Sequence, residues 1–572
     1  MVILNSNPKS DPENTESTLI SFDFSNELEN SDSRLNHSIF ANNTYNANNN
    51  EEDDGGDEND YNSNKNTNLL ETQHTYISND SKSKLKLNLN DSYGSVVDNQ
   101  INEETLTLVS VDNTSILKEI QGITKSSMPL MVTFLLQRSF SAVSVFFVGH
   151  LGKTELGAVT LGSMTANITG ISIIIGLATC LDTLCSQAYG SKNYKLVGVY
   201  CQRCIALLLT IIIPILLFWI FLSESFLNLI LSDKKLSSLS ASYLKINSIG
   251  MPGFILFECL KRFLQSQGIF HASTYVLIFC SPANILLHCL LIYNKSTSIG
   301  YLGAPLAVAI NYWLMPLGLI LYLVFNNNPI NPLKCWNGLN IRQAFKGWSR
   351  IITLAINGII MIVSEFLAFE ILTLSSSYLS LSSLAANSVI MSIISITYQL
   401  PFSIAIAVST RLANYVGANL VEKCKNCVKA GIILSLIMGL IDAIVLFSFK
   451  ENISRFFTND EEVLNEIYKC ITTLTVIQIF DSMNAITSGI LRGEGMQEIG
   501  SITNLSVHYL IGIPVSFFLG FKMNLRLNGL WIGMMVGLTV VSVIQGYYGI
   551  IKPNWDSLIR LARYRTEIER NI

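Results

Sequence analysis

The sequence predicts an all-α membrane protein, with twelve transmembrane helices in two six-helix lobes that follow a disordered N-terminal tail. Three observations predict this fold class. Hydrophobic residues make up 49% of the 572 residues and charged residues only 14%, whereas soluble domains carry about 25% charged residues. Apolar stretches long enough to cross a bilayer recur from Met128 onward. Charge also separates along the chain, because an acidic first part precedes a mildly basic remainder.

The acidic tail covers residues 1–115 and is rich in asparagine. It holds 21 acidic residues against 6 basic ones and sustains no hydrophobic periodicity. Such a segment has too little apolar surface to offset the chain entropy lost on folding. We expect a disordered cytosolic tail; the alternative is a regulatory arm that carries phosphorylation sites. The tail resembles neither a secretory signal peptide nor an arginine-rich presequence.

A transmembrane helix needs about 20 apolar residues. The fourth of the predicted spans is the weakest, because it contains Glu258, Lys261 and Arg262. Either this span is short, or its charged residues lie at its end or face a wet interior. The twelve predicted spans centre on 128–148, 156–182, 204–222, 246–265, 272–293, 303–325, 351–374, 384–408, 430–449, 470–490, 502–521 and 529–551.

Basic residues in the loops predict the orientation of the spans. An even number of spans places both termini on one side, and the loops of that side are richer in lysine and arginine, as at Arg342, Lys346 and Lys423. The C-terminal tail, 552–572, adds further arginines. We therefore expect both termini in the cytosol. The glycosylation sequons at Asn294 and Asn452 then fall on the opposite side.

An internal repeat divides the membrane region. The segment FLQSQGI at 263–269 matches ILRGEGM at 490–496, at an offset of about 227 residues. Two shorter matches, which pair 302–304 with 528–530 and 188–190 with 415–417, have nearly the same offset. The repeat predicts an N-lobe over 116–340 and a C-lobe over 341–551, related by a parallel pseudo-twofold axis. In secondary transporters built this way, substrates bind between the halves.

Five segments of the chain stand out as motifs: VGHLGKTELGAV at 148–159, LDTLCSQAYG at 181–190, SEFLAFE at 364–370, RLANYVGA at 411–418 and GILRGEG at 489–495. These segments resemble the multidrug and toxic compound extrusion (MATE) family in its eukaryotic, fungal-like branch. The similarity covers about 124–551 in the family's order. It implies a two-lobe exporter that expels organic cations or other toxic compounds by exchange for H⁺ or Na⁺.

Glu365 and Glu370, in the seventh span, are the strongest site candidates, because ionisable groups inside a membrane are costly. Five residues of helix correspond to about 140° of rotation, so the two carboxylates need not share a face. Apolar surroundings favour the neutral acid and a cationic substrate favours the carboxylate, so proton and cation compete for one charge. In the family, matching glutamates bind substrate or proton. The alternative is a helix-cap or ion-pair role.

Asp481, in the tenth span, has similar apolar neighbours, and the resemblance places it in the same C-lobe cavity. Gln478 lies on the same helix face. Some relatives carry a histidine there, so no titrating partner is expected at this position. Asp442, in the ninth span, has no assigned counterpart in the family, and its role stays open. Tyr398 is one of several aromatic residues that either stack on planar cations or anchor the helices.

The N-lobe offers weaker candidates. Asp182, in the second span, is either a cavity acid or a brace for the following turn. Gln137 and Asn167 either donate neutral hydrogen bonds to substrate or hold helices together. Many bacterial relatives carry an aspartate on the first span where Ser144 stands here, so we expect ion coupling to depend on the C-lobe acids.

Other motifs support neither a metal site nor ATP-driven transport. Two C-x-x-C pairs together can bind zinc, and such pairs occur at 201–204 and 424–427. The two pairs are far apart in the sequence, however, and out of register with the repeat. The sequence has no Walker loop, H-E-x-x-H motif or nucleophile elbow. We expect no cofactor and no enzyme activity, with H⁺ rather than Na⁺ as the coupling ion.

These observations together predict a secondary active transporter that exports organic cations, xenobiotics or related metabolites in exchange for H⁺, by alternating access between two lobes. Its expected partners are a cationic small molecule and membrane lipid, without nucleic acid, and we expect it to function as a monomer in the plasma or vacuolar membrane. The alternatives are a related two-lobe flippase of lipid-linked substrates, a major-facilitator carrier, a membrane-embedded enzyme, and a receptor or scaffold. The loop expected after the second span of a major-facilitator carrier is missing.

Overall fold

The computed structural model describes residues 115–570 except for 231–232, 295 and 326–330. The predicted disordered tail covers residues 1–115, and all of these except Ser115 lie outside the described range. All regular secondary structure within the described range is helical. Eleven helical stretches in it are long and apolar enough to cross a membrane, and they correspond to eleven of the twelve predicted spans.

Helices of the first half follow the predicted order of spans. The first span is α3 (Ile116–Gly149), and the second is a nearly continuous run of α4, η1, α5 and α6. The bounds of the remaining elements are α4 (Lys153–Ala166), η1 (Asn167–Ile171), α5 (Ser172–Ala178), α6 (Cys180–Gly190), α7 (Tyr194–Leu217), η2 (Phe218–Leu222), α8 (Ser223–Ile230), α9 (Lys234–Asn247), η3 (Ser248–Gly250), α10 (Met251–Ser266), α11 (His271–His288), η4 (Cys289–Tyr293), η5 (Gly300–Leu302) and α12 (Gly303–Phe325).

The second half begins with two short loop elements, η6 and α13, and its spans then start at α14. The bounds are η6 (Pro332–Cys335), α13 (Ile341–Ala344), α14 (Trp348–Ser377), α15 (Leu381–Thr397), α16 (Gln399–Gly417), α17 (Val421–Ser448), α18 (Lys450–Phe457), α19 (Glu461–Glu494), α20 (Gln497–Val507), η7 (His508–Gly512), α21 (Ile513–Phe517), η8 (Phe518–Lys522), α22 (Arg526–Gly546), η9 (Tyr547–Ile551) and α23 (Trp555–Arg570).

The fourth predicted span is the one that is missing from these eleven stretches. It is the run of α9, η3 and α10, and it carries Glu258, Lys261 and Arg262 in its buried second part. The first span, in contrast, starts twelve residues before its predicted start. The Ser115 side chain accepts a hydrogen bond from the Leu117 N–H and caps α3. The extra turns contain charged residues, so hydropathy alone could not detect them.

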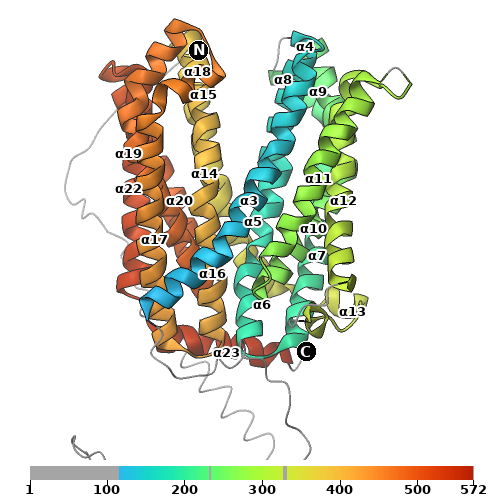
Figure 1. Cartoon of the computed structure of the whole chain (residues 1–572), viewed down its shortest axis with the longest axis vertical. Coiled ribbons are helices and arrows are strands. Elements are labelled where there is room, and N and C mark those ends of the chain that lie inside the picture. Colours follow the sequence, from blue (N-terminus) through green and yellow to red (C-terminus); the bar gives the residue numbers. More distant parts are fainter. Residues whose placement is uncertain (1–114, 231–232, 295, 326–330, 571–572) are drawn as a thin grey trace, which may run out of the picture. The chain divides into compact units, whose positions relative to one another are not determined.

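The first helix of each half packs into the core of the other half. In α3, Ile123 and Leu130 belong to a core cluster formed mainly by α16, α17 and α19. In α14, Ile351 and Leu354 belong to the cluster formed by α5, α6, α7 and α10. Figure 1 shows α3 passing from beside α16 and α17 to the side of α4 and α11. Two helices therefore cross between the lobes, one from each half.

The two halves meet most closely where α6 crosses α16. A Cβ atom on Gly190 would lie 2.0 Å from the carbonyl oxygen of Asn414, and one on Gly417 would lie 2.1 Å from that of Gln187. Only glycine allows backbones to approach this closely. Gly190 and Gly417, like Gln187 and Asn414, are separated by the 227 residues of the sequence repeat. The crossing therefore repeats itself about the predicted pseudo-twofold axis.

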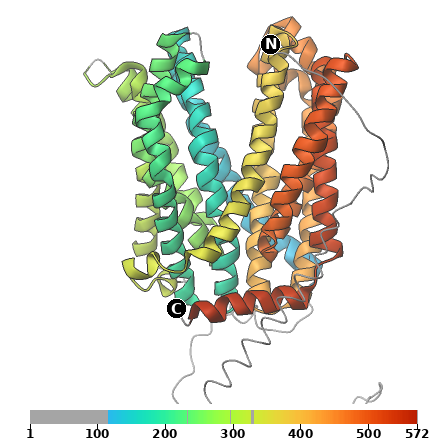
Figure 2. The same cartoon turned by 180° about the vertical axis from the view of Figure 1, so that it is seen from behind.

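The last helix, α23, lies across one end of the bundle (Figure 2). It contacts α7 of the first half and α16 of the second, and it buries Leu558, Ile559 and Ala562. The sequence predicted 552–572 only as a cytosolic C-terminal tail. The apolar residues of α23 recur at helical spacing among arginines, which makes a short amphipathic helix rather than a span.

Candidate functional site

Two acidic side chains come together inside the C-lobe, from α14 and α19. The Asn484 side-chain amide, on α19, donates a hydrogen bond of 3.4 Å to Glu365 Oε1, on α14. The charges of Glu365 and Asp481 are close enough to interact. Asp481 is only 3% exposed, and its Oδ1 has no hydrogen-bond partner among the described residues. The structure thus brings together the two strongest predicted acids of different helices.

Neither of these acids forms an ion pair with a lysine or arginine in the described part of the chain. The charge of Arg492, on α19, reaches Glu365, and no hydrogen bond joins these two side chains among the described residues. A carboxyl group in apolar surroundings that makes no ion pair is costly unless it binds a proton or a mobile cation. Asp481 is buried and Glu365 is half-buried, so the pair is suited to either ligand.

The other predicted C-lobe residues take different positions. Gln478 is buried one turn before Asp481, and its Nε2 has no hydrogen-bond partner in the described range. Glu370 is half-buried on α14. It takes part neither in the hydrogen bond between Asn484 and Glu365 nor in the interaction of charges between Glu365 and Asp481. The helical rotation between the two glutamates accounts for this separation.

Aromatic side chains lie beside the acids. Tyr398 is within electrostatic range of both Glu365 and Asp481, and its ring stacks on that of Phe402 at a centroid distance of 5.6 Å. The Arg492 guanidinium lies 5.8 Å from the centre of the Phe402 ring. Such a surface can stack on a planar organic cation while the acids neutralise its charge.

The N-lobe, in contrast, holds a buried group in which acids and bases are matched. Lys261 Nζ lies 2.7 Å from Glu258 Oε1, Arg262 Nη1 lies 2.5 Å from Glu258 Oε2, and Arg262 Nε lies 3.2 Å from Asp182 Oδ1. All four side chains are at least 95% buried. The charges that weaken the hydropathy of the fourth span thus compensate one another inside the lobe.

The predicted N-lobe residues largely belong to this paired group. Gln137, on α3, donates a 3.0 Å hydrogen bond to Glu258 Oε1, and Asp182 pairs with Arg262. These contacts favour the bracing alternative for both residues. Asn167 is exposed at the start of η1, apart from them. Ser144 forms a 2.9 Å hydrogen bond with His288 Nε2, on α11.

Asn484 and Arg492 are two residues of the site that the sequence did not predict. Asn484 follows Asp481 by three residues, so helical spacing could have placed it on the same face. Arg492 belongs to the predicted GILRGEG motif, but its closeness to α14 and α16 depends on packing between distant segments.

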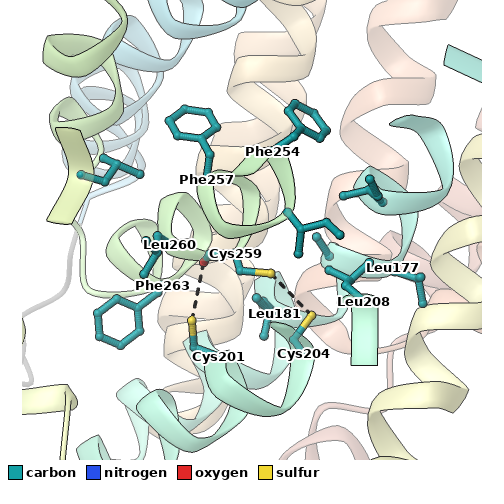
Figure 3. Packing of buried hydrophobic residues seen from close by; sticks show 14 of the residues in the cluster. Leu177, Leu181, Cys201, Cys204, Leu208, Phe254, Phe257, Cys259, Leu260 and Phe263 are labelled. Atoms are coloured by element: carbon teal, nitrogen blue, oxygen red, sulfur yellow. Dashed lines mark hydrogen bonds between the residues drawn. The ribbon is translucent and has the colours of Figure 1, made fainter. Parts of the chain in front are cut away.

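The two C-x-x-C pairs stay apart in the fold. Figure 3 shows Cys201 and Cys204, on α7, facing Cys259, on α10, among leucine and phenylalanine side chains. Cys204 Sγ lies 4.0 Å from Cys259 Sγ, whereas Cys424 and Cys427 belong to the core of the second half. Among the described residues, no group of three or more His, Cys, Asp or Glu side chains is arranged to hold a metal ion.

A helical membrane bundle of two repeated lobes, with unpaired acids buried in one lobe, defines a multi-pass membrane transporter. The model of the MatE family matches residues 129–290 and 358–518, which are two segments at nearly the predicted repeat offset. The chain therefore belongs to the MATE family, whose members are transporters and not enzymes.

Individual relatives agree with this assignment. An uncharacterized transporter of Saccharomyces cerevisiae is 41% identical over 466 residues, which cover 82% of this chain and just under two thirds (66%) of that protein. Multidrug and toxin extrusion protein 2 of Mus musculus is 31% identical, over 79% of this chain and 78% of its own length. The crystal structure of the eukaryotic MATE transporter AtDTX14 is 29% identical and superimposes with a TM-score of 0.74, over 79% of this chain and 99% of that one.

Proposed function

We propose that this transporter exports organic cations in exchange for H⁺, and that both bind the C-lobe acids in turn. The observation that carries the proposal is that Glu365 on α14 and Asp481 on α19 lie within electrostatic range of each other, and that neither forms an ion pair with a lysine or arginine among the described residues. A carboxyl group in apolar surroundings is stable when it is protonated or when a cation neutralises it. Binding of one ligand therefore weakens binding of the other, and this competition couples the two fluxes.

The names of the relatives support a toxic or foreign substrate. The mouse relative is named for multidrug and toxin extrusion, and an Arabidopsis thaliana relative that is 30% identical is named Protein DETOXIFICATION 17. Substrates of this kind are often planar, apolar cations. The stacked pair of Tyr398 and Phe402 beside Glu365 supports such a ligand.

The remaining candidates receive supporting roles in the proposal. Gln478 hydrogen-bonds the bound ligand next to Asp481, and Glu370 offers a second carboxylate further along α14. Asp182 and Gln137 brace the N-lobe wall through Arg262 and Glu258. Asn167 offers a neutral hydrogen bond at the surface of the second span.

The proposed setting is a monomer with both termini in the cytosol, in the plasma or vacuolar membrane. The basic residues of the loops support this orientation. Both membranes face an acidic compartment in fungi, so H⁺ rather than Na⁺ would drive export from the cytosol. No bound cofactor takes part in the proposed cycle.

Transport by the full chain in reconstituted vesicles tests the proposal. A fluorescent organic cation should accumulate when a pH gradient is imposed, and Glu365→Gln should lower the rate by about tenfold or more. Glu422→Gln, on the exposed side of α17, is the matched control and should transport like the wild type. Transport that ignores the pH gradient would reject H⁺ exchange, and full activity of Glu365→Gln would reject the role of that residue.

A further inference from the structure

Arg138, on α3, is a charged residue within a membrane span that the proposed function does not use. It stands at the middle of the first predicted span, 128–148, and its side chain is exposed. It forms no ion pair with an acid among the described residues. A charged side chain at this depth is costly unless it faces water or a ligand, so the direction in which Arg138 points decides its role.

The face of α3 that carries Arg138 packs against the second half of the chain in its earlier turns. Ile123 and Leu130 of this face belong to the core of the second half. The Phe134 ring, one turn before Arg138, lies with its centre 5.1 Å from the centre of the Phe402 ring on α16. Arg138 therefore stands one turn beyond a contact between the two halves.

Beyond this contact the same face of α3 is exposed. Ser141 and Val145, which follow Arg138 at helical spacing, are both exposed. The exposed apolar side chains of Val132 and Phe146, as expected of a side that faces lipid, lie about 80–120° from Arg138 around the helix. Arg138 therefore continues the face that is directed at the second half, not the side that faces lipid.

Glu365 follows Arg138 by 227 residues, which is the offset of the sequence repeat. It also has a corresponding place on α14, because Ile351 and Leu354, before it, pack in the core of the first half, and Glu365 itself is half-buried. Positions that a pseudo-twofold axis relates lie on opposite sides of that axis. The two crossing helices thus carry an arginine and a glutamate at equivalent positions of the two halves.

Three aromatic rings form a row between these two positions. Phe134, beside Arg138 on α3, contacts Phe402, whose ring stacks on that of Tyr398 at a centroid distance of 5.6 Å. Tyr398 in turn lies within electrostatic range of Glu365. The row offers a surface for stacking between a positive and a negative side chain, which suits a planar molecule that carries both charges.

We propose that the substrates of this transporter include zwitterions, which bind with their cationic group at Glu365 and an anionic group, such as a carboxylate, at Arg138. An arginine side chain presents a planar fork of N–H donors that matches the two oxygens of a carboxylate. One ligand then gives each side chain a partner of opposite charge, so no charge is enclosed without compensation. The inference rests on the proposed function, because it uses Glu365 as the cation site.

Two dyes with the same ring system test this inference in vesicles that contain the full chain. Rhodamine B carries a planar cationic ring system and a carboxylate, whereas its ethyl ester carries the cation alone. The wild type should take up both dyes under a pH gradient, after subtraction of the rates in vesicles without protein. Arg138→Gln should lower the ratio of rhodamine B uptake to ester uptake by about tenfold or more, because a hydrogen bond between charged groups is lost.

Two further variants separate the charge of Arg138 from its shape and position. Arg138→Lys keeps the positive charge without the fork of donors, so it should restore part of the uptake ratio. Lys125→Gln removes an exposed positive charge from an earlier turn of α3. It is the matched control and should leave the ratio unchanged.

An unchanged ratio in Arg138→Gln, or an equal loss of both dyes, would overturn the anion-binding role of Arg138. A wild type that carries the ester but not rhodamine B would reject zwitterionic substrates and leave the proposed export of cations intact. Uptake of the ester that ignores the pH gradient, or that is unaffected by Glu365→Gln, would instead reject the proposed function itself.

The wild type gives a second measurement that does not depend on the folding of a variant. Phenylglyoxal reacts with exposed arginine side chains, and peptide mass spectrometry measures the modified fraction of Arg138. Rhodamine B should protect Arg138 from this reaction more than its ethyl ester does at the same occupancy. Equal modification in the presence of the two dyes would contradict the proposal.

Discussion

Arg411, on α16, and Glu119, on α3, form an ion pair between the two halves of the transporter, with 2.9 Å between Nη2 and Oε2. The Tyr415 hydroxyl donates a further hydrogen bond of 2.8 Å to Glu119 Oε1. Gly122 leaves room for the guanidinium, since a Cβ there would lie 2.8 Å from Arg411 Nη2. The first turns of α3 are thereby fixed to the second half of the chain.

Loss of this pair should destabilise the fold. Glu119→Gln leaves the partly buried Arg411 without its counter-ion, and we expect the free energy of unfolding to fall by about 2–4 kcal/mol. Unfolding of the detergent-solubilised protein measures the change. Lys425→Ala removes a partner from the exposed pair with Glu422 and should cost less than about 0.5 kcal/mol. Equal effects of the two substitutions would contradict this expectation.

The close crossing of α6 and α16 should not tolerate even one methyl group. In Gly417→Ala the new Cβ would overlap the backbone oxygen of Gln187, and we expect a loss of about 1–3 kcal/mol from overpacking. Gly149→Ala, at the end of α3, is the control, because its Cβ would meet nothing closer than 4.0 Å. The yield of folded monomer and the midpoint of thermal unfolding should fall for the first variant only.

The protein should lose less stability when Glu258 and Lys261 are both replaced than when Lys261 alone is replaced. Lys261→Met leaves Glu258 with excess negative charge, and we expect a loss of about 3 kcal/mol or more. Glu258→Met combined with Lys261→Met removes the pair together and should recover at least about 1 kcal/mol of that loss. A double variant that is less stable than Lys261→Met would show that Glu258 acts mainly through Arg262, its other partner.

The C-terminal helix should detach when its buried face is charged. Ile559, on α23, is 6% exposed and packs into the core of the second half, whereas Leu561 is 41% exposed. Ile559→Asp should therefore make α23 accessible to protease, because burial of an isoleucine side chain contributes about 1.5–3 kcal/mol. Leu561→Asp should leave the cleavage rate close to that of the wild type. Cleavage at equal rates would indicate that polar contacts such as that of Arg350 with the Arg565 carbonyl hold the helix.

Hydropathy and the repeat were sufficient to predict most of the fold. Eleven predicted spans and the relation between the halves follow from runs of apolar residues and a fixed sequence offset. The fourth span was weak because its charges are compensated only in three dimensions. Arg262 neutralises Asp182 from a different helix, 80 residues away in the sequence, and no local pattern reveals such a partner.

The acids of the candidate site could be predicted from the sequence, but their neighbours in the fold could not. Glu365 and Asp481 stood out as charges within apolar runs, yet the sequence did not show that Asn484 donates a hydrogen bond to Glu365 or that Tyr398 lies within electrostatic range of both acids. The sequence ranked Asp182 lower, but it did not show that Asp182, unlike these two acids, forms an ion pair with an arginine. That distinction depends on which acids form an ion pair with a cation, and this is decided by helix packing.

The crossing of α3 and α14 between the lobes has a consequence for assembly. Each half of the chain supplies a helix segment that completes the core of the other. Ile123 and Leu130 of α3 pack in the core of the second half, and Ile351 and Leu354 of α14 pack in the core of the first. Neither half therefore encodes a complete hydrophobic core. A chain cut between α12 and α14 should give stable halves only when both are synthesised together, as two interlocked subunits of one molecule.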